Sequence, residues 1–143
     1  MNNWLTWSLF SAFFAGLTAV LAKIGVTGIN SNLATAIRTT VVLVFTWLLV
    51  LIGREPVVFA GLSRKTWLFL GLSGVATGLS WLCYFRALQL GDASRVAPVD
   101  KLSVVFVLIF AALVLRENVG WQQWLGGTLI LAGAVVLALA PHR

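Results

Sequence analysis

Five stretches of about 20 mostly apolar residues make up most of this sequence, and they constrain its fold more than any other feature. They cover residues 4–24, 32–52, 67–88, 94–115 and 121–140. A bilayer hydrocarbon core about 30 Å thick needs about 20 residues of α-helix to cross it. The sequence therefore predicts an all-α membrane protein with five transmembrane helices, in a single domain over residues 1–143.

The segments between these stretches carry the residues that end and begin helices. Glycines follow the first stretch, and Asn30 or Ser31 can cap the start of the second helix. Ser94 is the expected N-cap of the fourth helix, which places Pro98 in the first turn, where proline is tolerated. The fourth helix is therefore expected over about residues 94–115.

The composition excludes a soluble protein. Hydrophobic residues are 60% and charged residues 10% of the chain, against about 45–50% and about 25% in soluble domains. So few charges cannot cover a soluble globule, and disordered chains have the opposite, polar bias. The net charge of +6 is dispersed and forms no basic stripe, so we expect no nucleic-acid partner. The expected partners are the lipid bilayer and a small-molecule substrate.

The sequence lacks the residue sets that enzymes and metal sites need. It has one cysteine, and its one histidine, His142, has no partner nearby, which excludes a disulfide framework and a thiolate metal cluster. A Ser–His–Asp set, an HExxH motif and a phosphate-binding loop are also missing. We therefore expect no catalytic residues, no metal and no other cofactor.

An odd number of spans places the two termini on opposite sides of the membrane, here called face A for the N-terminal side and face B for the C-terminal side. Six of the seven tryptophans then fall near face A, at helix ends, as an interfacial aromatic belt requires: Trp4, Trp7, Trp47, Trp67, Trp121 and Trp124. Lysine and arginine set orientation only weakly, since they divide nearly evenly between face A (Arg54, Arg64, Lys65, Arg116) and face B (Lys23, Arg38, Arg86, Arg95, Lys101, Arg143). Such a chain is expected to insert in both orientations.

The order of features along the second half of the chain carries a family resemblance. An Ala-Leu pair precedes a short loop, and a proline, a long apolar run, an acidic residue and a glycine-rich last helix follow; the matching residues are Ala87, Leu88, Pro98, Glu117, Gly126, Gly127 and Gly133. Lys23 and Arg38 match recurring basic residues in the first half. The chain thus resembles a single EamA domain of the drug/metabolite transporter superfamily, in the five-span bacterial and archaeal subgroup, related to small multidrug resistance proteins.

This resemblance implies a secondary-active transporter in the inner (plasma) membrane of a prokaryote, and it implies export. Most EamA transporters resemble two such domains fused, whereas this chain has one. Membrane transporters commonly enclose a midplane site between inverted repeats. We therefore expect two copies to form a ten-helix unit that works by alternating access, as an antiparallel homodimer with dual topology or as a heterodimer with a paralogue.

Charged residues inside the spans are the first candidates for a substrate cavity: Lys23, Arg38, Arg86, Asp100 and Lys101. A charge at the centre of a span costs about 2.5–3.5 kcal/mol, so these side chains should face a partner or water. Snorkelling to the headgroups is the alternative for the long cationic side chains. Asp100 is expected either to pair with Lys101, Arg38 or Arg86, or to exchange protons. Four cations against one carboxylate favour anions or zwitterions as substrates.

Aromatic and small residues are the second group of candidates. Trp81, Tyr84 and Phe85 have i, i+3, i+4 spacing, which places them on one helix face as a wall for substrate stacking or as ordinary packing residues. Gly126 and Gly133 are seven apart on one face of the last helix, where small residues allow close approach of a second helix. They are expected at a dimer interface, with packing inside the chain as the alternative.

Together these features predict a transporter of small polar metabolites such as amino acids or organic anions, and the family resemblance implies that it is an exporter. One alternative is a multidrug cation exporter of the small multidrug resistance type. The absence of an acidic residue between Met1 and Arg54 speaks against it, because the first helix of that family carries a glutamate for cations. Another alternative is a non-transporting or lipid-flipping subunit that needs a different chain.

Overall fold

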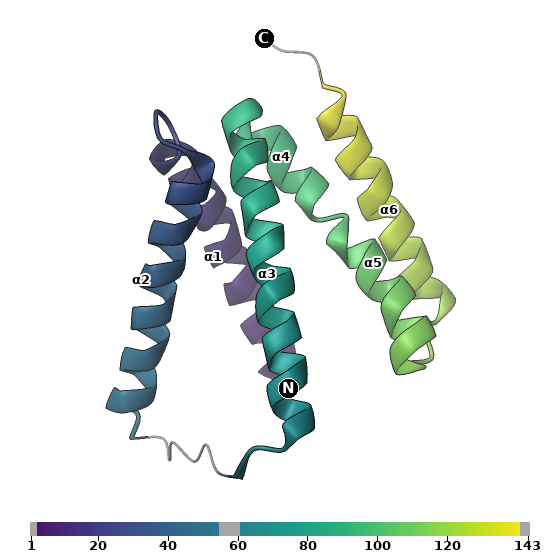
Figure 1. The fold of residues 1–143 in the computed structure, drawn as a ribbon. Helices are drawn as coiled ribbons and strands as arrows, with labels where there is room; N and C mark the ends of the chain where they lie inside the picture. The colour runs from purple at the N-terminus through teal and green to yellow at the C-terminus, as the bar shows by residue number, and fades with distance from the viewer. Residues whose placement is uncertain (1–2, 55–60, 141–143) are drawn as a thin grey trace. The chain divides into compact units, whose positions relative to one another are not determined.

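A computed structural model describes residues 3–54 and 61–140 as an assembly of helices (Figure 1). In chain order they are α1 (Asn3–Gly25), α2 (Ser31–Ile52), α3 (Arg64–Leu90), α4 (Ala93–Asp100), α5 (Ser103–Phe110), a π-helix η2 (Ala111–Leu115) and α6 (Trp121–Ala138). With α4, α5 and η2 counted as one span, 5 segments of 18–27 residues can cross a membrane by length and composition. The prediction of an all-α protein with five transmembrane helices is confirmed.

The chain divides into two compact units. One contains residues 1–24 and 90–143, and therefore α1 up to Ile24, α4, α5, η2 and α6. The other contains residues 25–89, and therefore α2 and α3. Within the first unit, α4 and α5 both pack against α6 (Figure 1).

Local hydrogen bonds explain where the helices of the 25–89 unit begin. Gly28 takes a left-handed φ of 80° in the turn after α1, a conformation that glycine adopts without steric cost. The side-chain Oδ1 of Asn30 accepts the N–H of Asn32 at 2.8 Å, so Asn30 is the N-cap of α2, as expected from the sequence. Ser63 does the same for α3, because its Oγ accepts the N–H of Thr66 at 3.1 Å.

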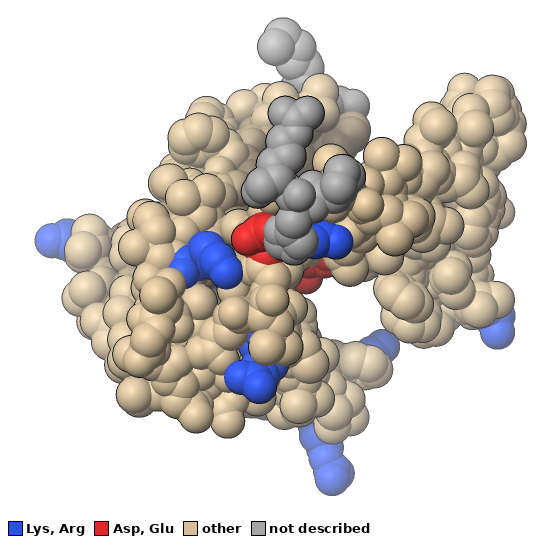
Figure 2. Space-filling model, turned by 90° about the horizontal axis from the view of Figure 1, so that it is seen from above, with Lys and Arg blue, Asp and Glu red and all other residues tan. Residues whose placement is uncertain are grey.

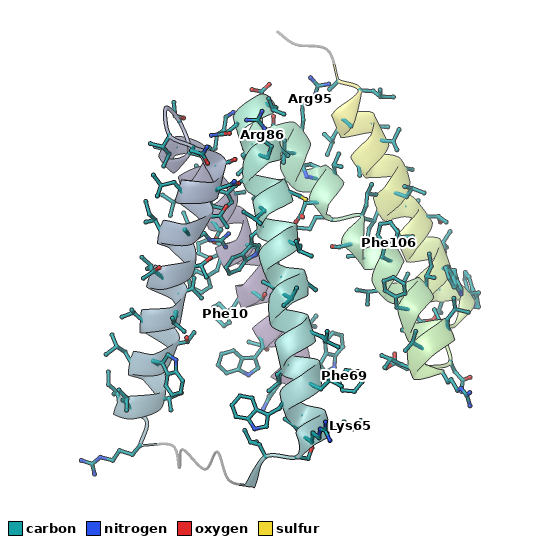
Figure 3. The ribbon with its side chains drawn as sticks, viewed as in Figure 1. Phe10, Lys65, Phe69, Arg86, Arg95 and Phe106 are labelled. Atoms are coloured by element: carbon teal, nitrogen blue, oxygen red, sulfur yellow. The ribbon has the colours of Figure 1, made fainter. Side chains whose placement is uncertain are left out.

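Large apolar side chains mostly project outward. Phe10, Phe69 and Phe106 point away from α1, α3 and α5, and each is more than half exposed (Figure 3). The buried residues of the unit that holds α6 are small, namely Ala19, Ala111, Gly127 and Ala134. In a bilayer, lipid tails solvate apolar side chains, so helices associate through close packing of small residues and not by hiding apolar area from water.

The fourth span, expected over about residues 94–115, covers Ala93–Leu115 and is interrupted between α4 and α5. The N–H groups of Lys101 and Leu102 bond the carbonyls of Pro98 and Val99 at 3.1 and 3.0 Å, an i→i+3 pattern that separates α4 from α5. The cap was misplaced: the N-cap is Asp92, whose carbonyl accepts the N–H groups of Arg95 and Val96. Pro98 therefore lies beyond the first turn. At that position proline has no N–H to donate within the helix. The i→i+3 hydrogen bonds begin at the next turn.

Arg95 fastens the start of α4 to the end of α6. Its Nε donates to the carbonyl oxygen of Ala138 at 3.0 Å, and its Nη2 donates to the same oxygen. The guanidinium is part-buried, and Ala138 is the last residue of α6 (Figure 3). A cation at this position satisfies a terminal carbonyl and also faces the negative end of the helix dipole.

Replacing Arg95 with methionine is therefore expected to destabilise the protein. Loss of a hydrogen bond to a charged group costs about 1.5–3 kcal/mol, and the carbonyl of Ala138 loses both of its donors on Arg95. Thermal unfolding in a mild detergent measures the effect. Lys65→Met, at an exposed position in the first turn of α3, is the matched control and should leave the melting temperature nearly unchanged. Equal losses for the two variants would show that the Arg95 contact contributes nothing specific.

Candidate functional site

The guanidinium of Arg38 lies on two aromatic rings of α3. Its Cζ atom is 4.1 Å from the ring centroid of Trp81 and 5.4 Å from that of Phe85. Arg38 projects from the second turn of α2, and the two aromatic residues are one helical turn apart on α3. All three residues belong to the 25–89 unit. The structure thus brings together Arg38 and Trp81, which the sequence had nominated separately.

The stacking lets a cation lie within a span without consuming its hydrogen-bond donors. A cation–π contact contributes about 2 kcal/mol when desolvated, which offsets much of the cost of about 2.5–3.5 kcal/mol for a central charge. No described residue accepts a hydrogen bond from Arg38 or forms an ion pair with it. The N–H groups of a stacked guanidinium lie in its plane, and they match the two oxygens of a carboxylate or phosphate. The uncommitted donors of Arg38 thus have the geometry that an anionic group requires.

Other predicted residues of this unit lie nearby along α3. The ring of Tyr84 contacts that of Phe85 edge-on, with centroids 6.5 Å apart. Nη1 of Arg86 donates to Oε1 of Gln89 at 3.1 Å, and Nε2 of Gln89 donates to the carbonyl of Ile29 at 2.5 Å. Arg86 is exposed near the end of α3, opposite Lys65 at its start (Figure 3). Through Gln89, Arg86 supports the turn that leads into α2.

In the unit that holds α6, Asp100 and Lys101 form an ion pair at the break between α4 and α5. Nζ of Lys101 is 3.5 Å from Oδ2 of Asp100, and the side chains are 55% and 37% exposed, respectively. The expected pairing of Asp100 with Lys101 is observed, and its proton-exchange role stays a prediction. Irregular backbone at membrane depth is tolerated where it is buried in protein or lines a water-filled cavity. Charged residues at the break are consistent with the second situation.

Lys23 has a structural contact. Its Nζ donates to the carbonyl of Gly91 at 2.8 Å, which ties the last turn of α1 to the connection before α4. Arg95 acts in the same way on Ala138. Four cations of the chain thus fall into two groups: Lys23 and Arg95 bond backbone carbonyls, whereas Arg38 and Lys101 bond none among the described residues.

The sequence analysis missed Arg95 and Gln89. Arg95 was counted only as a face-B charge, and its acceptor is 43 residues away along the chain. Gln89 bonds a carbonyl 60 residues away. A polar side chain within one turn of a helix end is a weak signal for such capping, but it does not identify the acceptor.

The glycines of α6 face different surroundings. A Cβ atom added to Gly127 would lie 2.8 Å from Cδ1 of Leu108, so this glycine allows α5 to approach α6 closely. A Cβ added to Gly126 or to Gly133 would meet no atom of the described residues within 4 Å. The close packing inside the chain therefore uses Gly127, while the Gly126/Gly133 face stays open. Figure 2 shows that most of the surface seen in that view is uncharged.

Comparison with known proteins identifies the family. The chain matches the EamA-like transporter family over residues 2–139. The chain belongs to this family. It is 53% identical over 138 residues to an uncharacterized transporter in the cobO 3' region of Sinorhizobium sp, a match that covers 96% of this chain and 98% of that protein. The resemblance to an EamA domain is thereby confirmed, and the protein is a multi-pass membrane protein of the drug/metabolite transporter type.

A second relative is a probable 4-amino-4-deoxy-L-arabinose-phosphoundecaprenol flippase subunit, ArnE, from Pseudomonas fluorescens. It is 32% identical over 76 residues, which cover 52% of this chain and 64% of that protein. No solved structure matches the chain.

The two groups of cations predict different effects on stability. Lys23→Met leaves the carbonyl of Gly91 without this donor and is expected to cost about 1–3 kcal/mol. Lys101→Met breaks an ion pair that is about half exposed, which contributes about 0–1 kcal/mol. Unfolding of both variants in the same detergent compares them directly. A loss for Lys101→Met as large as that for Lys23→Met would contradict the division into two groups.

Proposed function

We propose that this protein is a secondary-active exporter of small polar metabolites that carry a carboxylate or phosphate group, such as amino acids or organic anions. The observation that carries the proposal is Arg38, stacked on Trp81 and Phe85 with its hydrogen-bond donors uncommitted within the described residues. An anionic group in the plane of the guanidinium would relieve the remaining cost of a charge within the span. The rings of Trp81 and Phe85 would hold the guanidinium in place while it binds.

Charge supports anions or zwitterions over lipophilic cations. In the described part of the 25–89 unit, the charged candidates for the substrate cavity are the cations Arg38 and Arg86. No carboxylate forms an ion pair with either of them there. In the other unit, Asp100 is already paired with Lys101. A substrate cation would therefore meet no unpaired carboxylate among these candidate residues.

The broken fourth span supports a transport path. Transporters commonly place substrate and coupling-ion sites at discontinuous helices near the bilayer midplane. Here the interruption between α4 and α5 carries Asp100 and Lys101, both nominated from the sequence as cavity residues. We infer that these residues line the aqueous route, while Arg38 binds the anionic group of the substrate.

Two copies are proposed to form the working transporter, because one EamA unit supplies only half of the repeat pair that encloses a midplane site. The second copy is either the same chain in the opposite orientation or a paralogue. Support comes from Gly126 and Gly133, because no described residue of their own unit lies where their Cβ atoms would be.

Transport by Arg38 variants tests the proposal. Arg38→Gln is expected to reduce uptake of anionic or zwitterionic probes by roughly 10–150-fold, from the loss of about 1.5–3 kcal/mol of charged hydrogen bonding. Arg38→Lys keeps the charge but not the paired donors, so it should fall between wild type and Arg38→Gln. Proteoliposome uptake of radiolabelled succinate, glutamate and alanine is the measurement, with Lys65→Gln as the control.

The expected pattern is specific to anion recognition. Full uptake of these probes by a stable Arg38→Gln protein would remove Arg38 from the substrate site. Efflux of ethidium by wild-type cells, with no uptake of the anionic probes, would favour the multidrug cation exporter instead.

Oligomeric state tests the glycine face. Gly126→Leu and Gly133→Leu are expected to reduce the dimer population while the monomer still inserts, because leucine blocks close approach of a second helix. Gly127→Leu is the matched control, since it clashes with Leu108 and should destabilise the monomer itself. Crosslinking and light scattering in detergent measure the populations. An unchanged dimer in both Gly126→Leu and Gly133→Leu would place the interface elsewhere.

A flippase subunit for a lipid-linked sugar phosphate is the second candidate, favoured by the similarity to ArnE. A phosphate would engage the same guanidinium of Arg38. Purified protein alone in liposomes distinguishes the two functions. Uptake of soluble anions supports the transporter, whereas movement of a fluorescent polyprenyl phosphate only after addition of a second chain supports the subunit.

A further inference from the structure

Two arginines adopt a backbone conformation that normally belongs to glycine. Among the described residues, the non-glycine residues with positive φ are Arg54, at 52°, and Arg116, at 54°. Both values lie in the left-handed region, where the Cβ atom of an L-residue approaches the neighbouring carbonyl oxygen. Strained backbone conformations of this kind persist where the surrounding structure holds them, and they cluster at functional sites.

Both arginines stand where a membrane-spanning helix ends. Arg54 follows α2 and its C-cap Gly53, and its N–H bonds the carbonyl of Leu51 at 3.3 Å. Arg116 is the C-cap of η2, and its N–H bonds the carbonyl of Ala111, as does the N–H of Glu117 at 3.0 Å. Glycine is the usual residue for closing a helix in this way, because it has no Cβ. Helix closure alone therefore does not explain the arginines.

The direction of a helical side chain offers the explanation. In an α-helix every Cα–Cβ bond tilts toward the N-terminus of the helix. The second and fourth spans both end at face A, so a long side chain in their last turn starts back toward the bilayer centre. A residue in the left-handed conformation has left the helical backbone and is free of that tilt. An arginine can then extend from the helix end toward the headgroup layer.

We propose that Arg54 and Arg116 each bind the phosphate of an anionic phospholipid at face A. Both side chains are exposed, and no described residue accepts a hydrogen bond from either guanidinium or forms an ion pair with it. Guanidinium groups bind phosphate oxygens with two parallel N–H donors. The aromatic belt fixes the depth, since Trp47 precedes Arg54 by two turns and Trp121 follows Arg116 closely. This proposal does not depend on the transported substrate.

Lys65 provides a matched comparison on the same face. It lies in the first turn of α3, where the Cα–Cβ tilt already points toward face A, and it has no positive φ. It therefore carries a cation to the headgroup layer without strain. If only charge mattered, Lys65 and the two arginines would respond alike to anionic lipid.

The test compares melting temperatures in nanodiscs of phosphatidylcholine and of phosphatidylcholine with phosphatidylglycerol, and in an uncharged detergent. The variants are Arg54→Gly, Arg116→Gly, the double variant, Arg116→Lys and Lys65→Gln. Wild type should be stabilised by phosphatidylglycerol. The glycine variants should melt higher than wild type in uncharged detergent, because strain is relieved, and should gain less from phosphatidylglycerol. Arg116→Lys should show a reduced lipid gain without the rise in detergent.

Three results would overturn the proposal. The first is a rise in melting temperature from phosphatidylglycerol that is the same in the double variant as in Lys65→Gln. The second is a lower melting temperature of both glycine variants in uncharged detergent, which would show that the conformation is not strained. The third comes from sodium phosphate in detergent, compared with sodium chloride at equal ionic strength: a shift as large as that from phosphatidylglycerol would assign the sites to soluble phosphate.

Discussion

The backbone carbonyls at helix ends and in the connections between helices impose the constraint on which the rest of this structure depends. Near the hydrocarbon core such a group costs several kcal/mol if it has no donor, and the apolar spans offer few side chains that can donate. The protein answers with polar side chains from distant parts of the chain. Lys23 bonds the carbonyl of Gly91, Arg95 that of Ala138, and Gln89 that of Ile29. These bonds give each of the three carbonyls a donor, and at the same time they hold together the segments that meet there.

The same constraint makes Arg38 distinctive. A cation that bonds a backbone carbonyl has a structural role, so its removal should lower the free energy of unfolding. Arg38 is stabilised by the faces of Trp81 and Phe85, over which its Cζ atom lies, and its hydrogen-bond donors meet no acceptor among the described residues. A count of charged residues in the sequence does not distinguish Lys23 from Arg38. Only their surroundings separate a residue whose donor bonds a backbone carbonyl from one whose donors meet no described acceptor.

Features that depend on near neighbours could be predicted from the sequence. The five spans follow from apolar runs of the right length, and the cap at Asn30 follows from residue type and position. The break at Lys101 and Leu102 could not be predicted, because it depends on the helix starting at Ala93 and not after Ser94, which moves Pro98 beyond the first turn. The contacts of Arg95 and Gln89 could not be predicted either, since their acceptors are 43 and 60 residues away. The position of Arg38 over the ring of Trp81 could not be predicted either, because it is a contact between residues on two different helices.

The last helix shows how a small unit can serve two packing surfaces. Consecutive residues on a helix are about 100° apart, so Gly126 and Gly127 cannot face the same neighbour. Gly127 faces Leu108 within the chain, and Gly126 shares its direction with Gly133, seven residues on. Because lipid solvates an apolar helix face as well as protein does, a smooth face gains from a partner only through close approach, which glycine permits. One face of α6 therefore packs against α5 within the chain, while the other is the face that we propose meets a helix from a second copy.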